Sequence, residues 1–219
     1  MQEAIAPLLP FIVGGSAILI SITIHEFSHG LAAYLQGDMT ARDAGRLTLN
    51  PIAHMDLFGS LILPGLLILS KAPFLIGWAK PVPYDPSRLR NLRYGSFLVG
   101  IAGPLSNTIL ALIGGLALKY FYPLLGAHNF LVLFLAQLLL INVVLAVFNL
   151  IPLAPLDGSK ILFGLLPPRY EYISQKLDIY APYILLSLLM IEFSGYRILG
   201  RLIDFGLYGV TRLLGLSGL

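Results

Sequence analysis

Long apolar runs separated by short polar segments dominate the chain. Four of these runs have roughly the ~20 residues that an α-helix needs to cross a bilayer, and they cover residues 8–35, 97–118, 130–151 and 179–193. Beyond Gly195, charged residues are interspersed among apolar ones, as in a last helix packed on the others or a helix lying at the membrane interface. The pattern predicts an all-α polytopic membrane protein, a bundle of about four to six transmembrane helices in a single domain over residues 1–219.

Residues 57–78 are apolar enough to span the membrane, but prolines, glycines and a lysine interrupt them. A single crossing would place seven Lys and Arg residues on one side of the membrane and six on the other. A segment that dips in and returns would divide them ten to four, a bias that the positive-inside rule favours. We therefore expect a re-entrant or hairpin segment and an outward N-terminus, with residues 36–91 and 157–176 at the cytoplasmic face. In this arrangement, the ends of the first and third apolar runs lie on the same side of the membrane.

The composition supports a bilayer environment, with 57% hydrophobic and only 11% charged residues. Cysteine is absent, so a metal site has to use nitrogen and oxygen ligands. The net charge of +3 comes without any run of Lys or Arg, so we expect contacts with the lipid bilayer and no nucleic-acid partner. The N-terminal sequence Met-Gln-Glu-Ala lacks a basic region, so the first apolar run is expected to stay in place as a membrane helix.

Within the first predicted helix, His25 and His29 are four residues apart, so both imidazoles project from one helix face. This spacing is typical of a metal-chelating pair. The alternative is two helix histidines packed against polar neighbours, which is less favoured because ionisable side chains inside a membrane are costly and generally mark function. Glu26 is turned by ~100° from His25, so we predict that it acts as general base and does not bind the metal. No Lys or Arg lies within one helical turn to form a salt bridge with it.

A catalytic zinc ion uses three protein ligands and keeps one position open, so a third ligand has to come from elsewhere in the chain. Asp157 is the best candidate, because Pro152 and Pro155 interrupt the third apolar run just before it. The alternative for this residue is an Asp-Gly turn or a helix N-cap. The predicted topology favours the ligand role, since it places Asp157 on the same side as His29. We expect one Zn²⁺ per chain, ~10 to 15 Å below the membrane surface at a helical rise of ~1.5 Å per residue.

With these residues, the sequence resembles the site-2 protease family of intramembrane metalloproteases over about residues 18–158. Three motifs follow one another in the family's order: His25-Glu26-x-x-His29, Ala102-Gly103-Pro104-Leu105-Ser106-Asn107 and Asn149-x-x-Pro152-x-x-Pro155-Leu156-Asp157-Gly158. Two further stretches, residues 45–56 and residues 77–83, are similar to the short subgroup without PDZ or CBS domains. The chain is too short to hold such a domain, so we expect no regulation of that kind.

The resemblance implies that His25, His29 and Asp157 bind zinc. It also implies that Glu26 is the catalytic residue and that Asn149 makes a polar contact near the substrate or the oxyanion. Ser159 departs from the family pattern, because many relatives have a second glycine after Asp-Gly. This difference bears on the local backbone shape more than on the ligands.

The function implied is that of an intramembrane zinc metalloprotease that hydrolyses peptide bonds of transmembrane proteins or peptides, in the cell membrane and near its cytoplasmic face. The main alternative is a non-proteolytic metal-binding membrane protein, either a divalent-metal carrier or a scaffold. A carrier would be expected to show inverted repeats, which the sequence lacks, and a scaffold would be expected to have lost Glu26. A peptidase for soluble peptides at the membrane surface would use the same residues.

Three further polar residues are candidates for substrate binding. Asn107 and Asn149 lie in predicted membrane helices, where an amide either contacts the substrate or forms hydrogen bonds with a neighbouring helix. His54 either lines the entrance of the active site, supports or replaces a metal ligand, or caps the re-entrant segment. The dipeptide Gly103-Pro104 is expected to provide a close helix contact and not chemistry.

Residues 39–49 are polar and compatible with β-structure, with Gly37 before them and Gly45 among them. We expect a short β-hairpin or edge strand here, near the active site. Its resemblance to the membrane-associated strands of the family suggests the hypothesis that it holds an unwound substrate segment by β-addition.

Overall fold

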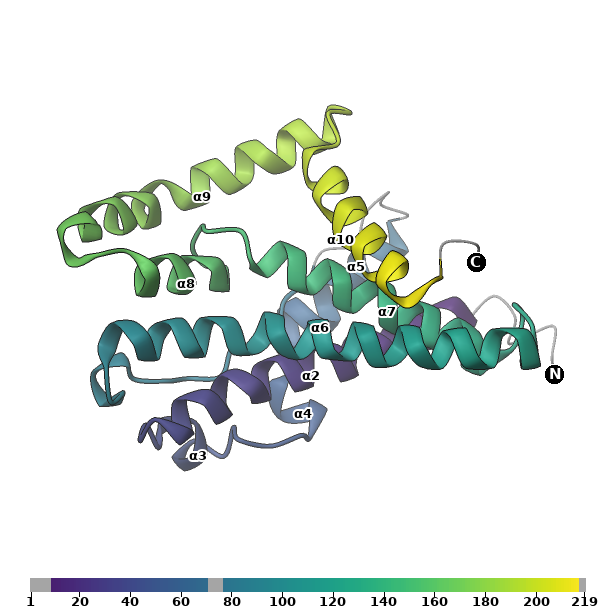
Figure 1. Cartoon of the computed structure of the whole chain (residues 1–219), viewed down its shortest axis with the longest axis horizontal. Coiled ribbons are helices and arrows are strands. Elements are labelled where there is room, and N and C mark those ends of the chain that lie inside the picture. Colours follow the sequence, from purple (N-terminus) through teal and green to yellow (C-terminus); the bar gives the residue numbers. More distant parts are fainter. Residues whose placement is uncertain (1–8, 71–76, 217–219) are drawn as a thin grey trace.

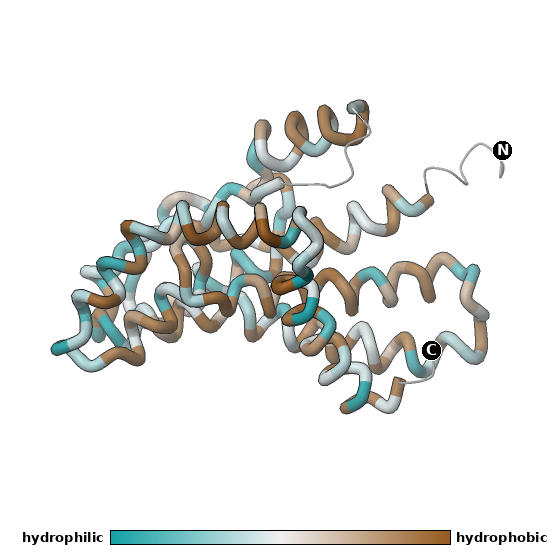
Figure 2. Tube along the Cα trace, turned by 90° about the horizontal axis from the view of Figure 1, so that it is seen from above, coloured by the Kyte–Doolittle hydropathy of each residue, from teal (hydrophilic) through white to brown (hydrophobic). Residues whose placement is uncertain are grey.

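Three long helices form the centre of the computed structural model, which describes residues 9–70 and 77–216 (Figure 1). They are α2 (Leu9–Leu35), α6 (Leu92–Leu125) and α7 (Phe130–Asn149), and each is long and apolar enough to cross a membrane. Hydrophobic residues predominate along them (Figure 2). Helix α6 packs against both α2 and α7. These helices confirm three of the four predicted spanning segments, although α6 extends beyond the predicted segment at both ends.

The fourth predicted segment, residues 179–193, is the second half of the longer helix α9 (Glu171–Phe193). Helix α10 (Ile198–Leu214) follows at an angle of 84° to α9 and packs against α6 and α7 (Figure 1). The tail beyond Gly195 therefore forms a helix packed on the bundle, as the first of the two alternatives predicts. If the bent pair counts as one span, the described residues hold four candidate spans, and otherwise they hold three.

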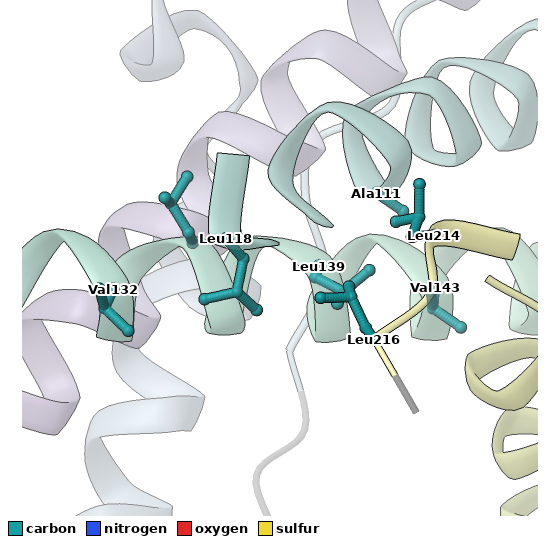
Figure 3. Close-up of a cluster of buried hydrophobic side chains, with 8 residues drawn as sticks. Ala111, Leu118, Val132, Leu139, Val143, Leu214 and Leu216 are labelled. Atoms are coloured by element: carbon teal, nitrogen blue, oxygen red, sulfur yellow. The ribbon is translucent and has the colours of Figure 1, made fainter. Parts of the chain in front are cut away.

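A cluster of buried aliphatic side chains joins α6, α7 and the end of α10 (Figure 3). Its members on α6 and α7 lie between these two helices, and Leu214 and Leu216, at the end of α10, pack against them. The Nζ atom of Lys119 donates a hydrogen bond to the Leu214 carbonyl over 2.7 Å, which satisfies an acceptor at the end of α10. Apolar packing and this cap together fix α10 on the bundle.

Residues 57–70 lead away from the bundle, and at Trp78 the chain is again beside Gly59 and Ser60. They form a π-helical turn (Leu57–Ile62) and helix α5 (Leu63–Leu69), and residues 71–76 lie outside the described part of the chain. At the return, the Trp78 N–H donates to the Gly59 carbonyl over 3.1 Å, and the Ser60 hydroxyl donates to the Trp78 carbonyl over 2.8 Å. The two ends of the segment are therefore held together, which favours the predicted hairpin over a single crossing.

The predicted β-hairpin at residues 39–49 is not formed, and none of the described residues forms a β-strand. The segment begins with the short helix α3 (Thr40–Asp43) instead. The Asp38 carboxylate accepts hydrogen bonds from the Thr40 N–H over 3.0 Å and from the Thr40 hydroxyl over 2.5 Å, a side-chain turn that leads into this helix. The N–H groups of residues 43–46 then bond to carbonyls within the segment, so they are not available to a partner strand. The structure thus shows no paired strand here, and β-addition of a substrate segment stays a prediction.

Helix α8 (Asp157–Leu165) lies close against α6, because α6 presents a glycine where the two helices meet. A Cβ atom at Gly100 would lie 2.9 Å from the Lys160 Cβ and 3.1 Å from the Asp157 carbonyl oxygen. Any larger residue at position 100 would therefore push the start of α8 away from the bundle. The close approach brings Asp157 to the centre of the molecule.

Candidate metal centre

Three side chains from two distant parts of the chain converge inside the bundle. The Oδ2 atom of Asp157 lies 3.1 Å from His25 Nε2 and 3.0 Å from His29 Nε2, and the two Nε2 atoms are 3.1 Å apart. All three residues are buried. The histidines lie on one face of α2, as their spacing predicts, and Asp157 lies in the first turn of α8. Among the described residues, this is the one group of three or more His, Asp or Glu side chains close enough to share a metal ion.

The Nδ1 atom of each imidazole is hydrogen-bonded to a carbonyl oxygen, and this contact directs the Nε2 atom toward Asp157. The Nδ1 atom of His29 lies 2.6 Å from the Val99 carbonyl oxygen, and that of His25 lies 2.5 Å from the Asn107 Oδ1 atom. A carbonyl oxygen can only accept, so each Nδ1 carries a proton, and in a neutral imidazole the Nε2 atom then presents its lone pair. Neutral histidines oriented in this way are the usual nitrogen ligands of a bound metal.

A buried hydrogen-bond network supports His25 through Asn107, which is fully buried. The Asn107 amide donates to the Asn142 Oδ1 atom over 2.7 Å, and the Asn142 amide donates to the Ser21 hydroxyl over 2.8 Å. These contacts join α6, α7 and α2 and match the interhelical alternative for Asn107. Sequence reasoning missed Asn142 and Ser21, although a polar side chain within an apolar helix was a usable signal.

Helix α6 approaches the histidines at Gly103 so closely that no side chain would fit. A Cβ atom at this position would lie 2.5 Å from His25 Cε1 and 2.6 Å from His29 Cε1. The prediction of a close contact at Gly103-Pro104 is therefore confirmed, and the backbone of α6 forms a wall of the candidate site.

The two carboxylate oxygens of Asp157 have different partners. While Oδ2 faces the histidines, Oδ1 accepts a hydrogen bond from Lys160 Nζ over 2.9 Å. Burial by itself would lower the pKa of the Lys160 ammonium, but the adjacent carboxylate outweighs this effect and raises it. The ammonium also lies 5.6 Å from the centre of the Tyr84 ring. Lys160 thus stays charged and leaves only Oδ2 directed at the histidines.

The chemistry and spacing of this donor set fit a zinc ion. Two neutral imidazoles and one carboxylate form a ligand set of catalytic zinc sites, with a fourth position left to water or substrate. Tetrahedral zinc with bonds of ~2.0–2.1 Å keeps its ligand atoms ~3.3 Å apart. The observed separations of 3.0, 3.1 and 3.1 Å are close to this value.

Glu26 lies next to the donor group without belonging to it. Its Oε2 atom accepts a hydrogen bond from the Val82 N–H over 2.8 Å. In the part of the chain that the structure describes, no Lys or Arg forms an ion pair with Glu26. The carboxylate is therefore held by a backbone amide.

His54 and Asn149 are not part of the donor group. The imidazole of His54 is 2% exposed, and its Nε2 atom lies 2.8 Å from the Thr48 carbonyl oxygen, which points to a structural role in the loop before the hairpin. Asn149, at the end of α7, donates from Nδ2 to the Leu145 carbonyl over 3.0 Å. A contact of either residue with substrate stays a prediction.

Comparisons with known proteins agree with this geometry. The model of the family described as Peptidase family M50 matches residues 125–191. Curated relatives include YwhC of Bacillus subtilis, 37% identical over 194 residues that cover 86% of this chain and 84% of the relative. Rip2 of Mycolicibacterium smegmatis is 33% identical over 76% of this chain and 60% of its own length, and a protein of Methanocaldococcus jannaschii is 34% identical over 36% of this chain and 22% of its own.

The words "zinc metalloprotease" stand in the names of all three relatives. No solved structure matches the chain. The similarity to YwhC extends over most of both proteins. The chain therefore belongs to peptidase family M50, the site-2 protease family.

Proposed function

We propose that this protein is an intramembrane zinc metalloendopeptidase of the site-2 protease type, which hydrolyses peptide bonds of membrane-spanning substrates and forms a single domain over residues 1–219. One observation carries the proposal: the Nε2 atoms of His25 and His29 and the Oδ2 atom of Asp157 lie within 3.1 Å of one another inside a bundle of apolar helices. Three nitrogen and oxygen donors buried among membrane helices are costly unless they bind an ion.

In this proposal His25, His29 and Asp157 hold zinc, and Glu26 is the general base. When bound, zinc acts as a Lewis acid that polarises a peptide carbonyl and lowers the pKa of water. Glu26 removes a proton from the attacking water and delivers it to the leaving amine. The Val82 amide engages Oε2 of Glu26, and none of the described residues donates a hydrogen bond to Oε1, so that oxygen is available to the water. Asn149 is proposed to contact the substrate or the oxyanion, on the basis of its motif.

The site is proposed to lie near the cytoplasmic face of the cell membrane. His29 and His25 precede the end of α2 at Leu35 by six and ten residues, so they lie inside the span but close to one end. The hairpin return at Trp78 supports the topology in which ten of the 14 Lys and Arg residues lie on this side. Water therefore reaches the site from the cytoplasm, and a substrate helix enters from the membrane.

Co-expression with candidate single-span membrane proteins tests the proposal. The wild-type chain should generate a cleavage product that Glu26→Gln fails to make, because glutamine keeps the size of the side chain but cannot accept the proton. Both proteins should contain about one zinc ion per chain. His25→Ala is the matched control, since it should lose cleavage together with zinc.

Equal cleavage by wild type and Glu26→Gln would remove Glu26 as the base. Full zinc content in Asp157→Ala would show that Asp157 is not a zinc ligand and only begins helix α8. A chain that carries zinc but cleaves no membrane-spanning substrate, while hydrolysing soluble peptides, would reassign the substrate and leave the chemistry in place.

A further inference from the structure

An extended segment over residues 78–85, here called the strap, crosses from the hairpin to α6 and is fixed at several points. Besides the Trp78 N–H at its start, three of its N–H groups donate to other parts of the chain: Lys80 to the His54 carbonyl over 2.9 Å, Val82 to Glu26 over 2.8 Å and Asp85 to the Asp38 carboxylate over 2.6 Å. Because each contact gives a backbone donor a fixed partner, these contacts determine the course of the strap.

Val82 is the point where the strap meets the candidate site. Its amide donates a hydrogen bond to Glu26. Its side chain is 7% exposed and faces α2 one helical turn after Glu26. At Gly30, four residues after Glu26, an added Cβ atom would lie 3.0 Å from Val82 Cγ1. Val82 is thus in contact with one face of α2 through both its backbone and its side chain, and its position sets the position of the Glu26 carboxylate.

Arg46 reaches the strap from the other side. Its side chain is buried, and its Nη2 atom donates to the Lys80 carbonyl over 2.7 Å and to the Pro81 carbonyl over 3.5 Å. Within the described part of the chain Arg46 forms no ion pair, so these carbonyls are its hydrogen-bond partners. A buried guanidinium without a carboxylate is costly, and here it serves to hold two consecutive carbonyls just before Val82.

His54 completes the attachment of the strap. Its carbonyl accepts the Lys80 N–H, while its imidazole bonds to the Thr48 carbonyl and so fixes the loop that carries both His54 and Arg46. The stretches 45–56 and 77–83, which the proposed chemistry leaves without a role, therefore form one hydrogen-bonded unit around Lys80.

We infer that Arg46 and His54 are positioning residues, which hold the strap so that the Val82 amide fixes the Glu26 carboxylate for proton transfer. The inference rests on the proposed function in one respect, the role of Glu26 as general base. Neither residue contacts the donor group, so both act on turnover through the strap and not through zinc binding.

Hydrogen exchange measured by mass spectrometry tests the attachment without any substrate. Prolines have no N–H, and the first two residues of a proteolytic fragment do not retain deuterium, so a fragment from residue 78 to residue 83 reports on only the amides of Lys80 and Val82. Loss of one anchoring hydrogen bond should accelerate exchange at these two amides by about tenfold in Arg46→Ala and His54→Leu. Arg46→Lys, which keeps the charge and one donor, should fall between Arg46→Ala and wild type.

Arg42→Ala is the matched control, because it removes an arginine from the same loop. Arg42 contacts the Met39 sulfur at 4.0 Å and does not touch the strap. In Arg42→Ala, hydrogen exchange at the Lys80 and Val82 amides should equal that of wild type. Wild-type exchange in Arg46→Ala and His54→Leu, with equal melting temperatures, would overturn the inference.

Turnover of fluorescein-labelled casein by the zinc-loaded chain in detergent provides the second readout. Arg46→Ala should lower kcat by about tenfold, while KM and zinc content stay unchanged. In a Glu26→Asp background the same substitution should have little further effect, because both changes act on one carboxylate.

Two failures are distinguishable. Cleavage by Glu26→Gln at the wild-type rate would refute the proposed function. Wild-type exchange and turnover in Arg46→Ala, with Glu26→Gln inactive, would refute only the positioning role. A higher kcat in Arg46→Ala would make the strap inhibitory and would also overturn the inference.

Discussion

The Asn107→Ala substitution removes the acceptor that orients His25 without touching any of the three donor residues. Asn107 Oδ1 lies 2.5 Å from His25 Nδ1, and the side chain is fully buried, so no water is at hand to replace it. Without this acceptor, the imidazole of His25 is free to rotate and to place its proton on either nitrogen. Its Nε2 atom is then less well prepared for zinc.

The loss expected for such a partner of a metal-ligating histidine is about 10- to 100-fold in zinc affinity. This corresponds to ~1.4–2.7 kcal/mol. The apoprotein should also lose ~1–3 kcal/mol of stability, because the Asn142 Oδ1 atom loses the amide donor at 2.7 Å. The two effects are separable, since only the first depends on zinc.

Zinc affinity can be measured by competition with a chelator of known affinity, on protein purified in detergent. Asn107→Asp should restore most of the affinity, because a carboxylate oxygen accepts the Nδ1 proton of His25. Asn142→Ala is the control: it disturbs the same network one step further away and should cost stability with a smaller change in zinc affinity. An Asn107→Ala protein that binds zinc as tightly as wild type would refute the reasoning.

Three further predictions follow from the fold and the site. Gly103→Ala should destabilise the protein by roughly 1–3 kcal/mol and reduce its zinc content, whereas Gly114→Ala on the same helix, where the nearest atom to an added Cβ is 3.4 Å away, should retain both. Chelation should abolish cleavage, and Zn²⁺ but not Mg²⁺ should restore it, because imidazole donors suit zinc. Burial alone would raise the pKa of Asp38, but hydrogen bonds from Thr40 and the Asp85 N–H outweigh it and lower the pKa. Asp38 therefore stabilises the fold above the unfolded-state pKa of ~3.9, and this contribution disappears as pH falls through the lower folded value. Unfolding measured between about pH 5 and pH 2 should depend less on pH in Asp38→Asn.

The sequence was sufficient to predict features that depend on the length of apolar runs, on the spacing of residues along a helix or on the number of Lys and Arg residues on each side of the membrane. The apolar runs gave α2 and α7 almost to the residue, because a span is defined by its hydrophobic length. The i, i+4 spacing placed His25 and His29 on one face, and the uneven distribution of Lys and Arg brought Asp157 to the same side. These arguments need no knowledge of how the helices pack.

Other features depend on contacts that leave little trace in a sequence. The β-hairpin at residues 39–49 was wrong because the chain turns at Asp38, whose side chain accepts hydrogen bonds from Thr40, and continues as a short helix, and a polar, β-compatible composition does not reveal this turn. The pairing of Asn107 with Asn142 depends on the rotation of α6 and α7 about their axes. The contact between Val82 and Glu26 involves a backbone amide, which any residue except proline can supply.

Because α6 has no side chain at Gly103, the residue at this position indicates whether the three donor residues can come together around a metal ion. It contributes no atom to the proposed reaction, yet two imidazole rings occupy the volume that any side chain would fill. A homologous sequence that keeps both histidines and the aspartate but has a larger residue at this position could not bring them together without displacing a membrane helix. The same three donors would then describe a chain that has lost its metal, so an inventory of ligands alone does not identify a working peptidase.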